Sequence, residues 1–176
     1  MNNLEVFRSI KTFIFDVDGV LTNNDVIILE NGRLIRKMNI RDGFAIKTAI
    51  RKGYRVAIIT GGKSSGVKEN FKNLGIKDLY TGVESKVEAF EDLVLTYDLD
   101  PGSILYMGDD IPDYEVMSLA GLACCPADAA IEIRRIATYA SNLKGGEGCA
   151  RDVIEKVLTL NGDWPFRKIE GFEDVT

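Results

Sequence analysis

Residues 12–21, which read TFIFDVDGVL, constrain the fold of this chain more than any other stretch. The first four residues are apolar or β-branched, as in a short buried strand, and they run directly into Asp16, Val17, Asp18 and Gly19. Ligands of an open α/β sheet bind just beyond the carboxyl ends of its strands. We therefore expect Asp16 at the strand tip, with Asp18 turned towards the same site.

Two carboxylates held this close repel each other, and no basic residue adjoins them. A hard divalent cation such as Mg²⁺ would relieve the repulsion, because it prefers oxygen ligands. The alternative is an Asx-type turn after a strand, in which Asp and Gly serve only the backbone geometry. This stretch alone leaves both interpretations open, and residues further along the chain decide between them.

Strand and helix patterns alternate along the rest of the chain, which predicts an α/β fold. We expect a three-layer, Rossmann-like arrangement, with a parallel sheet and helices on both of its faces. The length of 176 residues suits one domain over 1–176, and the tail 161–176 shows no clear period. Further strands are expected at 55–60, 78–81, 104–107 and 122–125. Helices are expected from Asp42 to Gly53, from Ser64 or Ser65 to 74, and over 85–97, 112–120, 128–136 and 150–160.

A small β-hairpin insertion is expected at about residues 22–38. Asn31 and Gly32 stand between two β-rich runs, which is the strongest short-range hairpin signal. Two strands alone have little core, so the apolar side chains need another surface. The hairpin then either folds back on its own domain or packs on another subunit.

Composition excludes several classes of function. The chain has no histidine, so histidine-based triads and zinc–histidine sites are ruled out, and acid–base work falls to carboxylates or lysines. The net charge of −5 argues against nucleic acid or an anionic membrane as a partner. Three cysteines without a CxxC motif suggest free buried thiols in a reducing compartment. With no signal-peptide core in residues 1–10 and no membrane-length apolar run, we expect a cytoplasmic protein.

Two later sites suit a phosphate group. Thr60 ends the expected strand 55–60 and is followed by Gly61 and Gly62, so a hydroxyl and backbone N–H groups stand at a strand tip. Lys86 begins a helix after a short strand, where it can neutralise phosphate charge. Taken singly, Thr60 could simply finish its strand, and an isolated lysine is more often a solvated helix residue.

Asp109, Asp110 and Asp113 form a GDDxxD pattern after the strand 104–107. They could be turn residues, with Asp113 as a partner of a helix dipole. The order along the chain favours a site instead: DxDG, then strand-Thr-Gly, then Lys, then strand-GDDxxD. Each motif stands in the strand context that would bring it to one crevice.

Over residues 11–160, this order resembles the haloacid dehalogenase superfamily of phosphohydrolases. The resemblance implies that Asp16 is the nucleophile and Asp18 the general acid and base. Thr60 matches the second motif of the superfamily and Lys86 the third. Asp109, with Asp110 and Asp113, matches the fourth.

The resemblance also implies the mechanism. Mg²⁺ would be held by Asp16, Asp109 and the backbone carbonyl of Asp18. Asp16 would attack phosphorus to give an aspartyl phosphate, and Asp18 would protonate the leaving oxygen and then activate water. Asp110 and Asp113 would act from outside the metal ligands, with Asp113 orienting metal-bound waters or Lys86. The remaining groups would bind the phosphoryl oxygens: Thr60, Lys86 and the backbone N–H groups of Val17 and Gly61.

Within the superfamily, the chain looks like the capless branch of 3-deoxy-D-manno-octulosonate 8-phosphate phosphatases, which serve lipopolysaccharide biosynthesis. The segments 39–43 (NIRDG), 126–129 (PADA) and 145–148 (GGEG) carry this likeness. In that family the hairpin helps to build a homotetramer, and neighbouring subunits complete each active site. The resemblance therefore implies a homotetramer without a cap domain. The implied substrate-binding residues are Asn39, Arg41, Asp42 and Gly43.

Three positions depart from that family. Gly62 stands where an arginine is frequent, and Asn70 and Asn73 lie where relatives supply basic residues. The alternative substrates are a nine-carbon 2-keto-3-deoxy sugar acid 9-phosphate and another small sugar phosphate.

Two other classes compete with a phosphatase. Receiver domains of two-component signalling also place carboxylates, a Thr and a Lys around magnesium, but they act as phosphorylation switches. Their phosphorylated Asp lies on a later strand than the acidic pair, whereas Asp16 follows the first strand here. The other alternative is a homologue that has lost catalytic activity and serves in assembly. Every core catalytic position is filled in this chain, which argues against this alternative.

Overall fold

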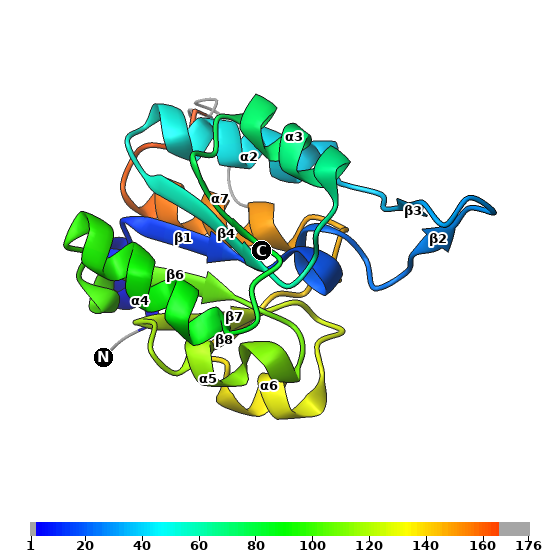
Figure 1. Ribbon diagram of the computed structural model, residues 1–176. Helices are drawn as coiled ribbons and strands as arrows, with labels where there is room; N and C mark the ends of the chain where they lie inside the picture. Colours follow the sequence, from blue (N-terminus) through cyan, green and yellow to red (C-terminus); the bar gives the residue numbers. More distant parts are fainter. Residues whose placement is uncertain (1–2, 166–176) are drawn as a thin grey trace.

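Six parallel strands form the centre of the computed structural model, which describes residues 3–165 (Figure 1). The strand order is β5-β4-β1-β6-β7-β8. The chain builds outwards from β1 first on one side and then on the other, so the crevice beside β1 is the ligand-binding position of such a sheet. The strands are β1 (Thr12–Phe15), β4 (Arg55–Thr60), β5 (Asp78–Thr81), β6 (Ile104–Met107), β7 (Leu122–Cys125) and β8 (Tyr139–Ala140).

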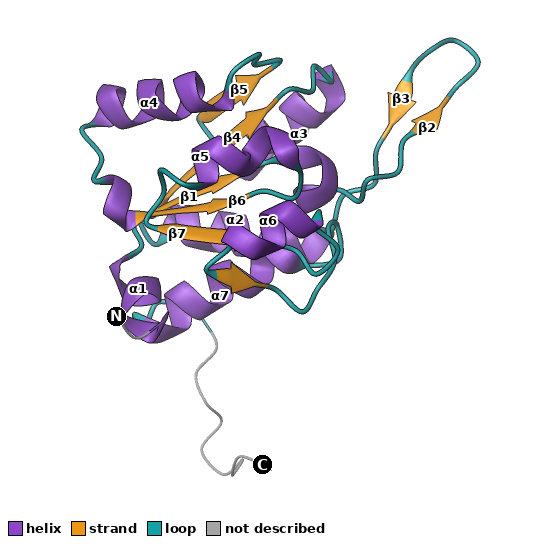
Figure 2. Ribbon diagram, turned by 90° about the horizontal axis from the view of Figure 1, so that it is seen from below, coloured by secondary structure: helices purple, strands orange, loops and turns teal. Residues whose placement is uncertain are grey.

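Helices cover both faces of this sheet, which confirms the predicted three-layer α/β fold (Figure 2). Phe13 and Phe15 of β1 point into one core and Ile14 into the other, because successive side chains of a strand face opposite ways. The first core is shared with α1 (Asn3–Ser9), α2 (Ile40–Arg51), α3 (Ser65–Leu74) and α7 (Cys149–Leu160). The second is shared with α4 (Lys86–Tyr97), α5 (Tyr114–Met117) and α6 (Ile131–Ile136).

The helix α2 begins earlier than predicted. The Asn39 side chain accepts a hydrogen bond from the backbone N–H of Arg41 at 2.9 Å, so Asn39 rather than Asp42 caps the helix. The helix predicted over 112–120 is also shorter. Pro112 lies in a 3-10 turn at Ile111–Asp113, and the α-helical part that follows has only four residues.

The start predicted for α6 is wrong. Asp128 lies outside the helix, and its side chain accepts a hydrogen bond from the backbone N–H of Gly145 at 2.9 Å. The aspartate therefore fastens a distant loop instead of capping the next helix. Neither α1 nor the two-residue strand β8 was predicted. The three cysteines are free and buried, as expected.

The chain leaves the sheet through a turn at Val17–Leu21, which the Thr22 backbone N–H closes by a hydrogen bond to the Val17 carbonyl, and then forms the predicted hairpin. β2 (Ile27–Ile28) pairs antiparallel with β3 (Leu34–Ile35), with Ile27 opposite Ile35. The hairpin stands out from the body of the chain (Figures 1 and 2). Ile27 is 62% exposed and Ile28 73%, so within one chain the hairpin does not fold back on its own domain.

In the part of the chain between residues 3 and 165, no helix has the length and apolar character needed to cross a membrane. Of the expected tail 161–176, residues 166–176 lie outside the described residues. The segment before them is docked, because the Trp164 ring packs edge-on against Phe44 of α2 with ring centroids 6.1 Å apart.

Candidate active site

A cavity of about 600 Å³ opens at the carboxyl ends of the central strands. Asp16 directly follows β1, Thr60 ends β4 and Asp109 follows β6, while Lys86 begins α4. The structure thus brings together residues that lie far apart in the sequence. The sequence-predicted residues that line the cavity are Asp16, Asp18, Thr60, Gly61, Lys86, Asp109, Asp110 and Asp113. Gly61 and Asp110 are the exposed members of this set.

Asp16 is buried between two donors. Its Oδ1 accepts a hydrogen bond from the backbone N–H of Val17 at 2.6 Å, and its Oδ2 lies 2.8 Å from Lys86 Nζ. Burial raises the pKa of Asp16 to about 7, and repulsion from Asp113 adds to the rise, although Lys86 opposes it. The single lysine therefore does not offset the combined effect of burial and of the Asp113 charge on the pKa of Asp16.

Lys86 bridges two aspartates. Its Nζ lies 2.8 Å from Asp16 Oδ2 and 2.7 Å from Asp113 Oδ1. Burial alone would lower the pKa of Lys86, but the two carboxylates outweigh burial and the pKa is raised. Asp113 is fully buried, and it also accepts hydrogen bonds from Tyr106 Oη at 2.8 Å and from the backbone N–H of Asp109 at 3.3 Å. Asp113 therefore fixes the lysine beside Asp16.

Asp109 approaches the DVDG turn closely. A Cβ on Gly19, which has φ of +85°, would lie 1.9 Å from Asp109 Oδ2, so only glycine fits there. Burial raises the pKa of Asp109 to about 6. Asn24, at the neck of the hairpin, donates from Nδ2 to Asp109 Oδ2 at 3.1 Å. Sequence reasoning missed Asn24, because 85 positions separate it from Asp109 and no local pattern links the two residues.

Three buried carboxylates, those of Asp16, Asp109 and Asp113, each offer an oxygen within 4.8 Å of the others. This donor set fits a hard divalent cation, since oxygen ligands and uncompensated negative charge are what Mg²⁺ requires. Asp113 is fully buried and accepts hydrogen bonds from three protein donors, whereas Asp16 is held by two donors and Asp109 by one. Asp16 and Asp109 are therefore the better ligands, in line with the sequence-based expectation.

Thr60 and the glycines after it form the opposite wall. Thr60 is 4% exposed, and its Oγ1 accepts a hydrogen bond from the backbone N–H of Gly62 at 3.1 Å. The backbone N–H of Val83 donates to the Thr60 carbonyl at 3.2 Å, and that of Gly82 to the Gly62 carbonyl at 2.9 Å. These bonds tie the loop after β4 to the loop that carries Lys86.

Asp18 lies at the edge of the cavity, and its carboxylate is held by Arg36 from the hairpin. Arg36 Nε lies 2.5 Å from Asp18 Oδ1, and Nη2 lies 3.1 Å from Oδ2. Thr22 Oγ1 adds a long contact to Oδ1 at 3.4 Å. Sequence reasoning missed Arg36, because only the course of the hairpin brings it back to Asp18.

The segment 39–43 does not line this cavity, so the structure does not bring its four predicted substrate-binding residues to the aspartates of the same chain. Asn39 donates from Nδ2 to the Gly146 carbonyl at 3.3 Å. Asp42 is buried and accepts a hydrogen bond from the backbone N–H of Arg151 at 2.7 Å. Gly43 faces Leu74, and Arg41 is exposed beside a different cavity. Within one chain, Asn39 and Asp42 hold the glycine-rich loop and α7 in place.

The chain closely resembles known sugar acid phosphatases in sequence. The 3-deoxy-D-manno-octulosonate 8-phosphate phosphatases of Salmonella typhi and of Escherichia coli strain K12 are each 37% identical to it over 155 residues. These matches cover 88% of this chain and 82% of each relative. No family model matches the chain.

Solved structures agree. The Yersinia pestis 3-deoxy-D-manno-octulosonate 8-phosphate phosphatase superposes with a TM-score of 0.89 at 32% identity, covering 91% of this chain and 86% of that one. The Moraxella catarrhalis enzyme, solved in complex with magnesium ion, phosphate ion and KDO, gives a TM-score of 0.87 at 29% identity. That match covers 91% of this chain and 92% of the other. With the aspartates, threonine and lysine gathered at the strand ends, the chain belongs to the family of 3-deoxy-D-manno-octulosonate 8-phosphate phosphatases in the haloacid dehalogenase superfamily.

Proposed function

We propose that this chain is a magnesium-dependent phosphatase that hydrolyses 3-deoxy-D-manno-octulosonate 8-phosphate to the free sugar acid and phosphate, within lipopolysaccharide biosynthesis. The observation that carries the proposal is the buried cluster of Asp16, Lys86, Asp109 and Asp113 at the ends of β1 and β6. It occurs in a chain 37% identical to phosphatases of that name. We treat residues 1–176 as one catalytic domain with a hairpin insertion and no cap.

Asp16 and Asp109, with the backbone carbonyl of Asp18, would hold Mg²⁺, which when bound supplies positive charge to the carboxylates and the phosphoryl oxygens. Asp16 is the nucleophile: one carboxylate oxygen forms a bond to phosphorus as the bond from phosphorus to the sugar oxygen breaks. Asp18 gives a proton to that departing oxygen. It then takes a proton from the water that attacks the aspartyl phosphate, which releases phosphate and restores Asp16.

Phosphoryl transfer depends mainly on stabilising spread negative charge. Lys86 is suited to this task, because Asp113 holds its ammonium group beside Asp16. Thr60 and the backbone N–H groups of Val17 and Gly61 complete the proposed phosphoryl site. In the structure the Val17 N–H donates to Asp16 itself, so this bond has to shift when the N–H binds a phosphoryl oxygen. Asp110 stands at the exposed rim of the cavity.

The hairpin supports a homotetramer, in which neighbouring subunits complete each site. Its strands are exposed, with large apolar side chains in contact with water. Apolar patches of this kind mark interfaces in most proteins that carry them. A neighbouring subunit would also offer a route by which Asn39, Arg41, Asp42 or Gly43 could reach substrate. The cytoplasmic location stays a prediction from the sequence.

A phosphate-release assay over sugar phosphates, with and without magnesium, tests the function. We expect magnesium-dependent release, with the highest kcat/KM for 3-deoxy-D-manno-octulosonate 8-phosphate. A clear preference for a nine-carbon sugar acid 9-phosphate would reject this substrate but keep the reaction. Gly62, which lacks the frequent arginine of the family, is the residue that makes this comparison necessary. Absence of phosphate release from every compound would reject the reaction itself.

A further inference from the structure

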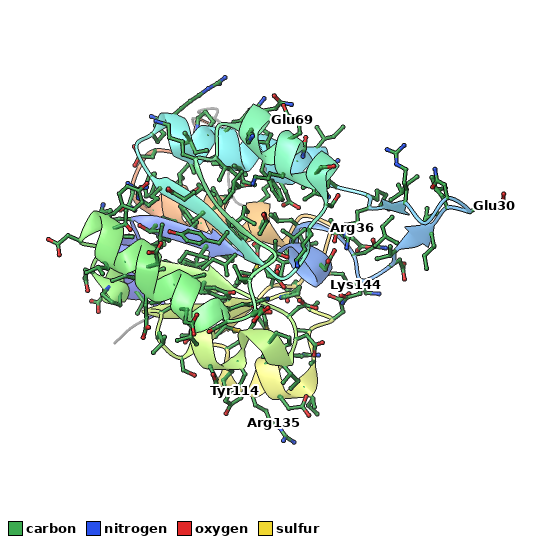
Figure 3. All side chains as sticks on the ribbon, in the orientation of Figure 1. Glu30, Arg36, Glu69, Tyr114, Arg135 and Lys144 are labelled. Atoms are coloured by element: carbon green, nitrogen blue, oxygen red, sulfur yellow. The ribbon has the colours of Figure 1, made fainter. Side chains whose placement is uncertain are left out.

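Arg36 occupies a special position on the hairpin. Residues 24–35 are all exposed, whereas the Arg36 side chain turns inwards and is only 10% exposed. Figure 3 shows Arg36 where the hairpin joins the domain. Both oxygens of Asp18 accept hydrogen bonds from its guanidinium group, at 2.5 Å and 3.1 Å. This bidentate contact is the geometry in which arginine binds carboxylates most strongly.

The contact conflicts with the role proposed for Asp18. A carboxyl group that donates and accepts protons needs an oxygen free to face the leaving group and the water. In the structure the guanidinium engages both oxygens. Arg36 therefore has to leave Asp18, at least in part, during each turnover.

A second cavity, of about 670 Å³, offers space into which the Arg36 side chain can move away from Asp18. Asp18 lines the cavity of the aspartates, while Arg36 lines this second one together with Met38, Asn39 and Asn70. The ion pair thus stands at the border between the two spaces. A short movement of the guanidinium would free Asp18 without any change in the sheet.

The charges that line the cavity of the aspartates favour a second cationic side chain near Asp18. Lys86 is the one basic side chain among the described residues that line the cavity of the aspartates, and Asp16 and Asp113 already engage it. The other charged residues of the lining are acidic, and they include Glu84 and Glu115. Gly62 contributes no side chain, and a Cβ there would lie 3.6 Å from Asp18 Oδ2. A substrate that carries a carboxylate besides its phosphate needs a second positive group, and Arg36, whose guanidinium group contacts Asp18 of this cavity, can supply it.

We infer that Arg36 is a specificity residue that exchanges the carboxylate of Asp18 for the carboxylate of a sugar acid substrate. Because substrate binding draws Arg36 away, Asp18 becomes free for proton transfer only when a carboxylate-bearing substrate is present. This inference rests on the proposed function. It adds selection for sugar acids over neutral sugar phosphates, achieved by a residue of the hairpin.

The test compares two substrates in the full-length enzyme with magnesium. One is 3-deoxy-D-manno-octulosonate 8-phosphate, and the other is an aldopentose 5-phosphate, which has no carboxylate. For Arg36→Ala, we expect kcat/KM for the sugar acid to fall about 10- to 100-fold, chiefly through KM, as for the loss of a charge-assisted hydrogen bond. For the pentose phosphate we expect kcat/KM to rise, because Asp18 is no longer occupied.

Two further variants sharpen the test. Arg36→Lys keeps the positive charge but loses the bidentate hydrogen bonding of the guanidinium group. Its kcat/KM for the sugar acid should therefore lie between those of wild type and Arg36→Ala. Arg135→Ala removes an exposed arginine from α6, which lines neither of the two cavities, and should match wild type on both substrates. Product inhibition gives a binding readout. In Arg36→Ala the inhibition constant of the free sugar acid should rise, while that of inorganic phosphate should not.

The outcomes separate the possibilities. Equal losses on both substrates, or no change on either, would overturn the inference, because a structural role or an idle contact predicts them. A loss on the sugar acid with an unchanged pentose phosphate would support carboxylate binding but overturn the control of Asp18. If the wild-type enzyme itself fails to hydrolyse the sugar acid phosphate, the proposed substrate fails, and the inference fails with it.

Discussion

The carboxylate of Asp16 sits 2.8 Å from Lys86 Nζ and is only 7% exposed, so its chemistry is set by a few fixed neighbours. Replacing it with Asn keeps the shape but removes the nucleophile. We expect Asp16→Asn to lower kcat by at least about three orders of magnitude, as removal of a nucleophile does in other enzymes. Phosphate release measures the loss, and circular dichroism should show that the fold survives.

The matched control for that change is Asp98→Asn. Asp98 is exposed at the end of α4 with φ of +48°, a conformation that Asn adopts readily, so turnover should stay at the wild-type level. Wild-type turnover in Asp16→Asn itself would falsify the aspartyl-phosphate mechanism.

Metal binding should appear in stability as well as in activity. Repulsion among Asp16, Asp109 and Asp113 weakens the folded state, and a cation that binds only this state stabilises it. We expect Mg²⁺ at a hundredfold excess over its Kd to raise the Tm of the wild type by roughly 5–10 °C. In Asp109→Asn most of this rise should vanish. An equal Tm rise in both proteins, measured by scanning calorimetry, would place the metal elsewhere.

Among single residues, the sequence predicted those that stand at the ends of strands. It missed those that a distant segment of the chain brings to the site. Asp16, Thr60 and Asp109 could be identified because each stands at the carboxyl end of a recognisable apolar strand, and such ends converge in a parallel sheet. Asn24 and Arg36 sit on a hairpin whose path relative to the sheet has no local signal. Their contacts with Asp109 and Asp18 are set by tertiary structure.

Among the elements, those with a clear local signal were predicted, including the two short strands of the hairpin, whereas α1 and β8 were missed. β4 and α3 matched their predicted bounds, because apolar runs and capping residues mark them clearly. β8 has only two residues, and α6 starts three residues after Asp128. β8 is held by its pairing with β7, with Tyr139 opposite Cys124, and Asp128 accepts a hydrogen bond from the Gly145 N–H instead of capping α6. Propensity carries little information about elements this short.

Asp42 couples two helices, α2 and α7, and its burial gives a testable pH dependence. Its Oδ1 accepts from the Arg151 N–H, whereas its Oδ2 is a buried side-chain oxygen without a partner among the described residues. Burial raises the pKa of Asp42 to about 6 from an ordinary value of 3.8. Because the folded state binds this proton more tightly, the contribution of Asp42 to stability falls as pH rises from about 4 to about 6.

Asn does not titrate, so Asp42→Asn should gain stability relative to wild type over that pH window. We expect the difference in the free energy of unfolding to shift in favour of the variant by up to about 3 kcal/mol between pH 4 and pH 7, and to stay flat above. Urea denaturation in the presence of a chelator measures it. Asp98→Asn should show no such shift. A difference that is constant with pH would mean that Asp42 titrates normally in the folded chain.

At the scale of the whole molecule, the exposed apolar side chains of the hairpin are the feature that bears on assembly. Sequence patterns were enough to predict a hairpin at about 22–38, but not what its apolar side chains contact. The structure shows that they do not return to their own sheet, since Ile27, Ile28 and Leu34 are 62%, 73% and 48% exposed. Alternation along a two-stranded ribbon can hide only one of its faces.

From this exposure we predict a homotetramer built through the hairpin. Between residues 3 and 165 no cap domain covers the crevice, so a neighbouring subunit is the available cover, and phosphoryl transfer benefits from the exclusion of water. Ile27 and Ile35 are cross-strand partners, so replacing both with Glu puts two like charges face to face on the apolar patch. We expect the wild type to have the mass of four 19.5 kDa chains by light scattering, and Ile27→Glu/Ile35→Glu to dissociate and lose activity.

The matched control is Leu95→Glu, which makes the same kind of change at an 84% exposed position on α4, far along the chain from the hairpin. It should leave both mass and turnover at wild-type values. Activity of the hairpin variant should recover in part at high protein concentration, because association is a mass-action equilibrium. A wild-type enzyme that is monomeric at micromolar concentration and fully active would contradict the shared site, since a single chain would then suffice to close the crevice around its substrate.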